Sequence, residues 1–169
     1  MKVAFFKGKH PGWKGWLGVL TKWWTCGPYS HCELVFGTQA STGLSTCWSS
    51  TWLDKGVRCA QIVLDPAMWD VIDVPTTAEQ DAAALAWFKA NEGAPYDTLA
   101  LFGFLFRPLK GVGNRYFCDE ACLEAMGFPE AWRYDPNSAY QLLLGVAGLL
   151  EANVKCGMVP HQLAPLESV

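Results

Sequence analysis

The sequence predicts an α+β domain in which one antiparallel sheet packs against helices. In the first half of the chain, up to about residue 74, short extended segments are separated by turns such as GTQASTG and DPAMWD. After Thr77 the pattern changes to longer segments with helical spacing. Strands followed by helices, rather than alternating with them, are typical of one sheet that is covered by helices.

Length and composition indicate one domain over residues 1–169. The chain is long enough to bury a core, and 51% apolar with 17% charged residues is not the composition of a disordered protein. A net charge of −3 with scattered lysines argues against a nucleic-acid partner, which usually requires a basic surface. No transmembrane segment is expected, because the most apolar stretch, Leu142–Leu150, is far shorter than the ~20 residues that a spanning helix needs.

The extended segments of the first half are expected to be strands, and their brief connections favour an antiparallel meander. They are Lys2–Phe6, Cys32–Phe36, Cys47–Thr51, Arg58–Leu64 and Val71–Val74. Between the first two, apolar residues recur at helical spacing and Gly27-Pro28 ends the pattern. These residues are Trp13, Trp16, Leu17, Leu20 and Trp24. We expect a helix that turns most of its tryptophans towards the core, a sugar-stacking surface being the alternative.

The second half predicts helices in succession. Thr77 and Gln80 form a capping-box signature that opens an Ala-rich helix to about Asn91. Three further helices are expected over Leu99–Phe106, within Tyr116–Gly127, and over Ser138–Asn153.

The seven cysteines are expected to be free thiols. An odd number without any CxxC pair fits neither a disulfide framework nor a zinc site. The N-terminal residues lack the apolar core of a signal peptide, since Lys7 and Lys9 follow the first strand directly, so synthesis in a cytosol is expected. Most of the cysteines are therefore expected to fill the core, and one or two to carry chemistry.

The stretch YSHCELVF at Tyr29–Phe36 places a histidine and a carboxylate two residues apart. Side chains alternate along a strand, so His31 and Glu33 share one face while Cys32 lies on the other, core-facing side. A carboxylate beside a histidine can hold its tautomer and stabilise the imidazolium, as a general base requires. A polar, solvated strand face is the alternative, and these residues alone favour it.

Cys118 falls in the first turn of the helix expected in YFCDEACLEAMGF. At the first turn the helix dipole favours a thiolate and lowers the thiol pKa, and a nearby histidinium lowers it further. Alternatively Cys118 opens a core stripe, because apolar residues follow at helical spacing at Ala121, Cys122, Ala125 and Met126. Both can hold, since a nucleophile on a helix must face the sheet that carries its base. Cys122 is assigned to packing.

These motifs together resemble the circularly permuted papain-like hydrolases, a branch of the NlpC-like peptidases that includes relatives of lecithin–retinol acyltransferase. In that branch a strand with SHxE precedes a helix that starts with a CSE-like motif; here SHCE lies at Ser30–Glu33 and FCDE at Phe117–Glu120. GAPYD at Gly93–Asp97 looks like the family's G-x-P-Y-D turn, and DPNSAYQLL at Asp135–Leu143 like its closing segment. Asp119 stands where serine is usual, and a negative charge there opposes thiolate formation.

The resemblance implies a permuted NlpC-type fold, an antiparallel sheet or partial barrel against helices, and a thiol hydrolase that needs no metal or organic cofactor. Cys118 would be the nucleophile, His31 the base and Glu33 the group that orients it, with Ser49 or Ser50 as alternatives in the third role. The backbone N–H of Cys118 would contribute to the oxyanion hole.

For the substrate, the resemblance allows peptidoglycan stem peptides, other amides, and lipid or acyl esters. Tyr96 and Ser49 are candidate substrate-binding residues; a buried structural role is the alternative at Tyr96. A small chain without a leader suits a phage-type protein that is released by lysis or carried in a virion, which favours peptidoglycan. The alternative class is an inactive binding or assembly module, and Asp119 is the feature that suggests it.

Overall fold

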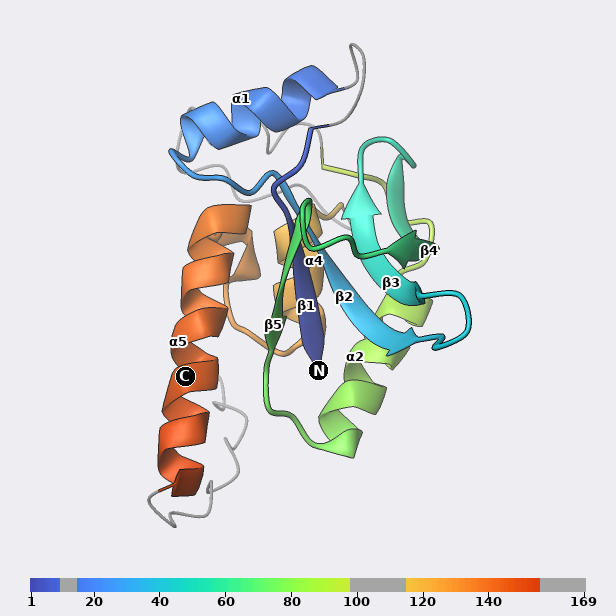
Figure 1. Ribbon diagram of the computed structural model, residues 1–169. Coiled ribbons are helices and arrows are strands. Elements are labelled where there is room, and N and C mark those ends of the chain that lie inside the picture. Colours follow the sequence, from blue (N-terminus) through green and yellow to red (C-terminus); the bar gives the residue numbers. More distant parts are fainter. Residues whose placement is uncertain (10–14, 98–114, 156–169) are drawn as a thin grey trace.

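The computed structural model describes residues 1–9, 15–97 and 115–155, and over these it confirms the α+β class. The strands fall in the first half and, apart from α1, the helices follow (Figure 1). The elements are β1 (Lys2–Phe6), α1 (Trp16–Trp24), β2 (His31–Thr38), β3 (Leu44–Thr51), β4 (Gly56–Val63), β5 (Trp69–Asp73), α2 (Ala78–Ala90), α4 (Cys118–Ala125), the 3-10 helix η2 (Ala131–Arg133) and α5 (Pro136–Lys155). The helix expected over Leu99–Phe106 lies outside the described residues, as does Trp13.

The strands form one open antiparallel sheet in the order β4-β3-β2-β1-β5. β2, β3 and β4 make the expected meander, but β5 does not continue it and pairs with β1 at the opposite edge. The reason lies in β1, whose residues 3–6 are all buried. Buried backbone groups need hydrogen-bond partners on both sides of the strand, and β2 and β5 supply them.

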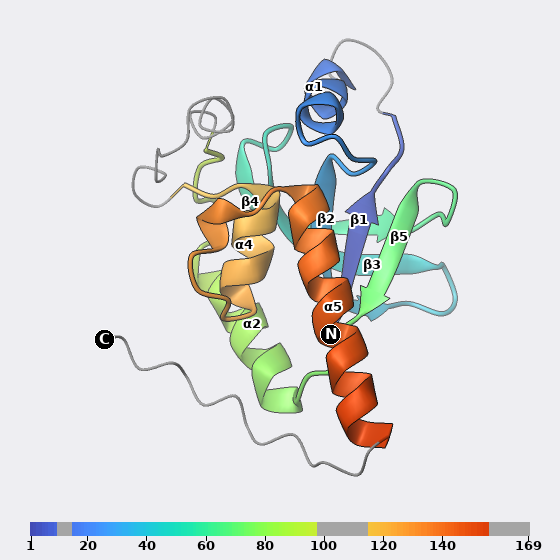
Figure 2. The ribbon, with the colours of Figure 1, turned by 90° about the vertical axis from the view of Figure 1, so that its left-hand side faces the viewer.

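The helices α2, α4 and α5 cover one face of the sheet, and α1 lies across the end where β2 begins (Figure 2). The main core lies under these helices and includes Phe5, Cys32, Leu34, Phe88, Cys118, Cys122 and Leu143. A smaller apolar cluster on the opposite face contains Trp69 of β5, and Ile62 of β4 packs against it.

Local capping confirms two helix starts. The Thr77 hydroxyl accepts a hydrogen bond from the Gln80 N–H at 3.3 Å, and the Gln80 side chain accepts one from the Thr77 N–H at 2.8 Å. α5 begins slightly earlier than predicted, because the Asp135 carboxylate accepts hydrogen bonds from the N–H groups of Asn137 and Ser138.

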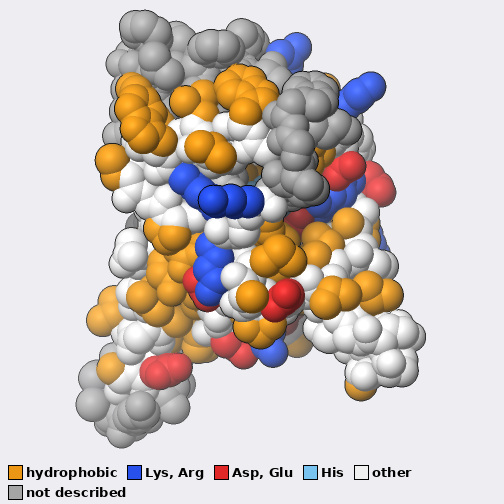
Figure 3. Space-filling view, turned by 45° about the horizontal axis from the view of Figure 1, so that its top comes forward, with side chains coloured by type: hydrophobic (Ala, Val, Ile, Leu, Met, Phe, Trp, Pro, Cys, Tyr) orange, Lys and Arg blue, Asp and Glu red, His pale blue; other side chains and the backbone are white. Residues whose placement is uncertain are grey.

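The prediction that α1 turns its tryptophans towards the core is wrong. Trp16, Trp23 and Trp24 are 53%, 70% and 40% exposed, and Val19 is also exposed. α1 crosses the end of the sheet instead of packing on a face, and hydrophobic side chains are exposed on this end of the molecule (Figure 3). Among the described residues, no helix is both long and apolar enough to cross a membrane.

The GAPYD turn is attached to the sheet at Gly56. Val57 donates a backbone hydrogen bond to the Ala94 carbonyl at 2.9 Å, and Tyr96 donates one to Lys55 at 3.1 Å. A Cβ atom on Gly56 would clash with the Ala94 carbonyl oxygen.

We therefore expect Gly56→Ala to lower the free energy of unfolding by about 1–3 kcal/mol, measured by urea denaturation. Gly37→Ala is the matched control, because a Cβ there meets nothing within 4 Å. Equal effects of the two substitutions would contradict the proposed attachment.

Candidate active site

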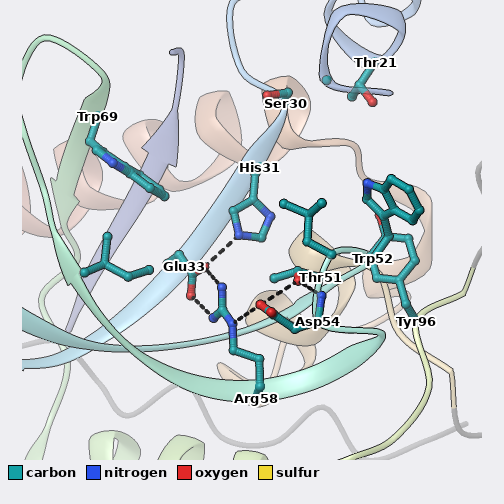
Figure 4. A pocket seen from close by; sticks show the side chains of 13 residues that line it. Thr21, Ser30, His31, Glu33, Thr51, Trp52, Asp54, Arg58, Trp69 and Tyr96 are labelled. Atoms are coloured by element: carbon teal, nitrogen blue, oxygen red, sulfur yellow. Dashed lines mark hydrogen bonds and ion pairs between the residues drawn. The ribbon is translucent and has the colours of Figure 1, made fainter. Parts of the chain in front are cut away.

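A cavity of about 240 Å³ opens beside α1 at the start of β2 (Figure 4). Its lining combines α1, β2, the β3–β4 turn, β4, β5 and the GAPYD turn; it includes Thr21, Ser30, His31, Glu33, Thr51, Trp52, Asp54, Arg58, Trp69 and Tyr96. Of the predicted site residues, His31, Glu33 and Tyr96 thus line one cavity. Ser49 and Cys118 are not part of the lining.

His31 and Glu33 are joined by a hydrogen bond of 2.7 Å between Nε2 and Oε1. Glu33 is 0% exposed, so the alternative of a solvated strand face is wrong. With Nε2–H donating to the carboxylate, Nδ1 is the basic nitrogen of the neutral ring. The pair therefore has the arrangement that a general base and its orienting carboxylate require.

Arg58 forms a two-pronged ion pair with Glu33. Its Nη1 and Nη2 donate to Glu33 Oε2 and Oε1 at 2.7 and 2.6 Å, and its Nε donates to Asp54 Oδ2 at 3.0 Å. Asp54 in turn accepts a hydrogen bond from the Thr51 hydroxyl. Burial alone raises the pKa of Glu33, but the hydrogen bonds from Arg58 and His31 outweigh it and bring the pKa below its usual value. The carboxylate is therefore ionised although it is fully buried.

Sequence reasoning missed Arg58. On β4 it lies opposite Ser49 of β3, and extending the β2–β3 register by one residue places Ser49 opposite Glu33. The three residues thus form a row across three strands, and the small serine lets the arginine reach the carboxylate. The sequence does contain a signal for Arg58: strand alternation places it on the same face as the apolar Ala60 and Ile62, where a buried arginine needs a counter-charge.

The predicted alternatives for the third role have other partners. Ser49 is fully buried and donates its hydroxyl to the Cys32 carbonyl at 2.7 Å, so it does not face a substrate. The Ser50 hydroxyl donates to the Tyr116 carbonyl at 2.6 Å. Of the three candidates, Glu33 is the one that hydrogen-bonds His31.

Cys118 is the first residue of α4 and is 4% exposed, in the core that also holds Cys32. A hydrogen bond from the Cys32 thiol and the charge of His31 outweigh burial and lower the pKa of Cys118 well below its usual value. Burial lowers the pKa of His31, but the Cys118 charge and the hydrogen bonds with Cys118 and Glu33 raise it to about 10. Each of the two groups thus favours the charged form of the other.

Tyr96 lies at the cavity edge next to the start of α4. Its ring packs edge-on against Phe117, with centroids 5.4 Å apart. Burial and then the negative charge of Cys118 raise the pKa of the Tyr96 hydroxyl. The GAPYD turn therefore contributes a phenol to the cavity lining that the charge of the candidate nucleophile reaches.

Comparison with protein-family models and with curated proteins gives no match to this chain. Function is therefore inferred from the geometry of the site.

Proposed function

We propose that the chain is a cysteine hydrolase with a circularly permuted, papain-like NlpC-type fold, which cleaves an amide bond through an acyl-enzyme. The observation that carries this proposal is the buried series of contacts from Arg58 through Glu33 and His31 to Cys118. An ionised carboxylate, a histidine and a low-pKa thiol at a helix start are the components of a thiolate–imidazolium catalyst. The motif order, with SHCE before FCDE, supports the permuted arrangement.

In this mechanism the Cys118 thiolate attacks the substrate carbonyl, and the protonated His31 gives its proton to the leaving amine as the C–N bond breaks. The resulting thioester is hydrolysed by a water whose proton His31 accepts, which restores the thiolate–imidazolium pair. The backbone N–H of Cys118 has no intrahelical partner at the first position of α4 and is available to the oxyanion.

Peptidoglycan stem peptides are the proposed substrate. Purified protein incubated with peptidoglycan fragments should release new amine ends, and Cys118→Ala should stop their release. Intact fragments in the presence of a reactive Cys118 would overturn this substrate while leaving the nucleophile in place.

An acyl ester or lipid is the second candidate, and the exposed apolar face of α1 favours it. Gly18 and Thr21 of this helix line the cavity, whereas by helical periodicity its exposed Trp16, Val19 and Trp23 face away from the cavity. The same short helix therefore carries both a wall of the cavity and an exposed apolar surface. Cys118-dependent turnover of short-chain acyl esters, with fragments left intact, would select this candidate.

We expect His31→Ala to reduce the alkylation of Cys118 at mildly acidic pH by roughly 100-fold, because the thiolate loses its counter-ion. Glu33→Gln should reduce it less, by about tenfold, because the carboxylate acts through the histidine. Peptide mass spectrometry after a brief iodoacetamide pulse measures both rates. A larger loss in Glu33→Gln than in His31→Ala would reverse the assigned roles.

A further inference from the structure

Asp119 is in contact with the candidate nucleophile. Its Oδ1 lies 3.4 Å from the Cys118 sulfur, and the residue is only 1% exposed. Its other oxygen, Oδ2, is buried and has no hydrogen-bond partner among the described residues. An ionised carboxylate without adequate partners is very costly to bury, so this environment favours a neutral acid.

A hydrogen bond between this sulfur and this oxygen requires one proton, which has two possible places. Ordinary pKa values near ~8.5 for a thiol and ~3.9 for an aspartic acid place it on sulfur, by a factor of roughly 10⁴ to 10⁵. The surroundings act in the opposite direction. The sulfur interacts with the His31 charge and with the thiol and backbone N–H of Cys32. For Asp119, the hydrogen bond within the described part of the chain that favours the ionised form comes from its own N–H.

We propose that the Asp119 carboxyl is a catalytic group that stays protonated and donates a hydrogen bond to the Cys118 thiolate. The inference rests on the proposed function, because it concerns the same nucleophile. It removes the objection that a negative charge after the cysteine opposes thiolate formation, since a neutral acid stabilises the neighbouring charge. When two acidic groups in contact share one proton, their pKa values move apart, so that one group stays protonated while the other is ionised.

The charges around Asp119 agree with this assignment. Burial and then the charge of Cys118 raise the pKa of Asp119 well above its usual value, and the charge of Asp135, just before α5, acts in the same direction. From the GAPYD turn, Tyr96 also faces the pair, and Asp119 contributes to the raised pKa of its phenol. Burial and the charges of Cys118 and Asp135 therefore disfavour a second negative charge at the start of α4, while His31 is the neighbour that acts in the opposite direction.

The test compares two substitutions by the rate of iodoacetamide labelling of Cys118 at mildly acidic pH. Asp119→Asn keeps the shape and a neutral donor, so the rate should stay within a few-fold of that of the unmodified chain. Asp119→Leu removes the donor, so the rate should fall about 10- to 100-fold. Equal rates in all three proteins, or faster labelling in both variants, would overturn the proposal.

Infrared spectroscopy supplies a readout that does not depend on the leucine variant folding. At neutral pH the difference spectrum between the unmodified chain and Asp119→Asn should contain the carbonyl band of a protonated carboxylic acid. The difference is needed because Glu120, whose pKa burial raises to about 7, contributes to the same region. A carboxylate band in its place would overturn the proposal.

The two experiments together distinguish this inference from the proposed function. If Cys118 of the unmodified chain does not react at acidic pH, the proposed function fails. If Cys118 reacts but Asp119 proves ionised, only this inference fails.

Discussion

Cys118→Ala is expected to abolish hydrolysis, with a loss of roughly 10³-fold or more in turnover. Every covalent step of the proposed mechanism uses this sulfur, and no other thiol of the described residues interacts with His31 in the way that Cys118 does. The measurement is the release of amine ends from peptidoglycan fragments, or of acid from short-chain acyl esters, by equal amounts of folded protein.

Cys122→Ala is the matched control. Cys122 lies one turn further along α4, is 1% exposed and belongs to the same core cluster, but unlike Cys118 it is not among the groups that raise the pKa of His31. This variant should keep its activity apart from a modest loss of stability. Similar activity losses in both variants would show that the cysteines matter for packing alone.

Arg58→Met is expected to destabilise the protein by about 3–5 kcal/mol, because it leaves the carboxylate of Glu33 buried without its cation. Urea denaturation near neutral pH measures the loss. The activity should fall as well, because the carboxylate that orients His31 loses its hydrogen bonds from Arg58.

The double variant Arg58→Met with Glu33→Gln should recover much of this stability, because neither charge is then left unpaired.

The stability loss caused by Arg58→Met should also depend on pH. The pKa of Glu33 is lowered in the folded state, so the stabilisation it provides is present above the unfolded pKa of ~4.3 and is lost as the pH falls through the folded value. The gap between Arg58→Met and the unmodified chain should therefore shrink in acid; a gap that is constant with pH would contradict the ion-pair account.

The elements that could be predicted were those whose signals are local. The Thr77 cap, the succession of strands and the start of α4 all follow from short patterns. The position of β5 could not be read in this way, because it depends on the need of the buried β1 for a second hydrogen-bonded neighbour. The orientation of α1 failed for a related reason: its periodicity predicts an apolar face but not whether anything packs on that face.

The site also contains one part with a local sequence signal and other parts that depend on contacts between distant residues. The adjacency of His31 and Glu33 follows from strand alternation, and their hydrogen bond confirms it. Arg58 depends on the register of three strands and on the small size of Ser49, neither of which a single strand reveals. The state of Asp119 depends on burial, which reverses the effect that its charge in water would suggest.

The most direct test of the thiolate–imidazolium pair is the pH dependence of iodoacetamide labelling, mapped onto each cysteine. Cys26 and Cys59 are exposed and serve as internal references of ordinary accessibility. At mildly acidic pH, Cys118 should be labelled first and by a wide margin although it is buried, because a hydrogen bond from Cys32 and the charge of His31 lower its pKa. Labelling of Cys118 only at alkaline pH, after Cys26 and Cys59, would contradict the pair and favour a non-catalytic binding module.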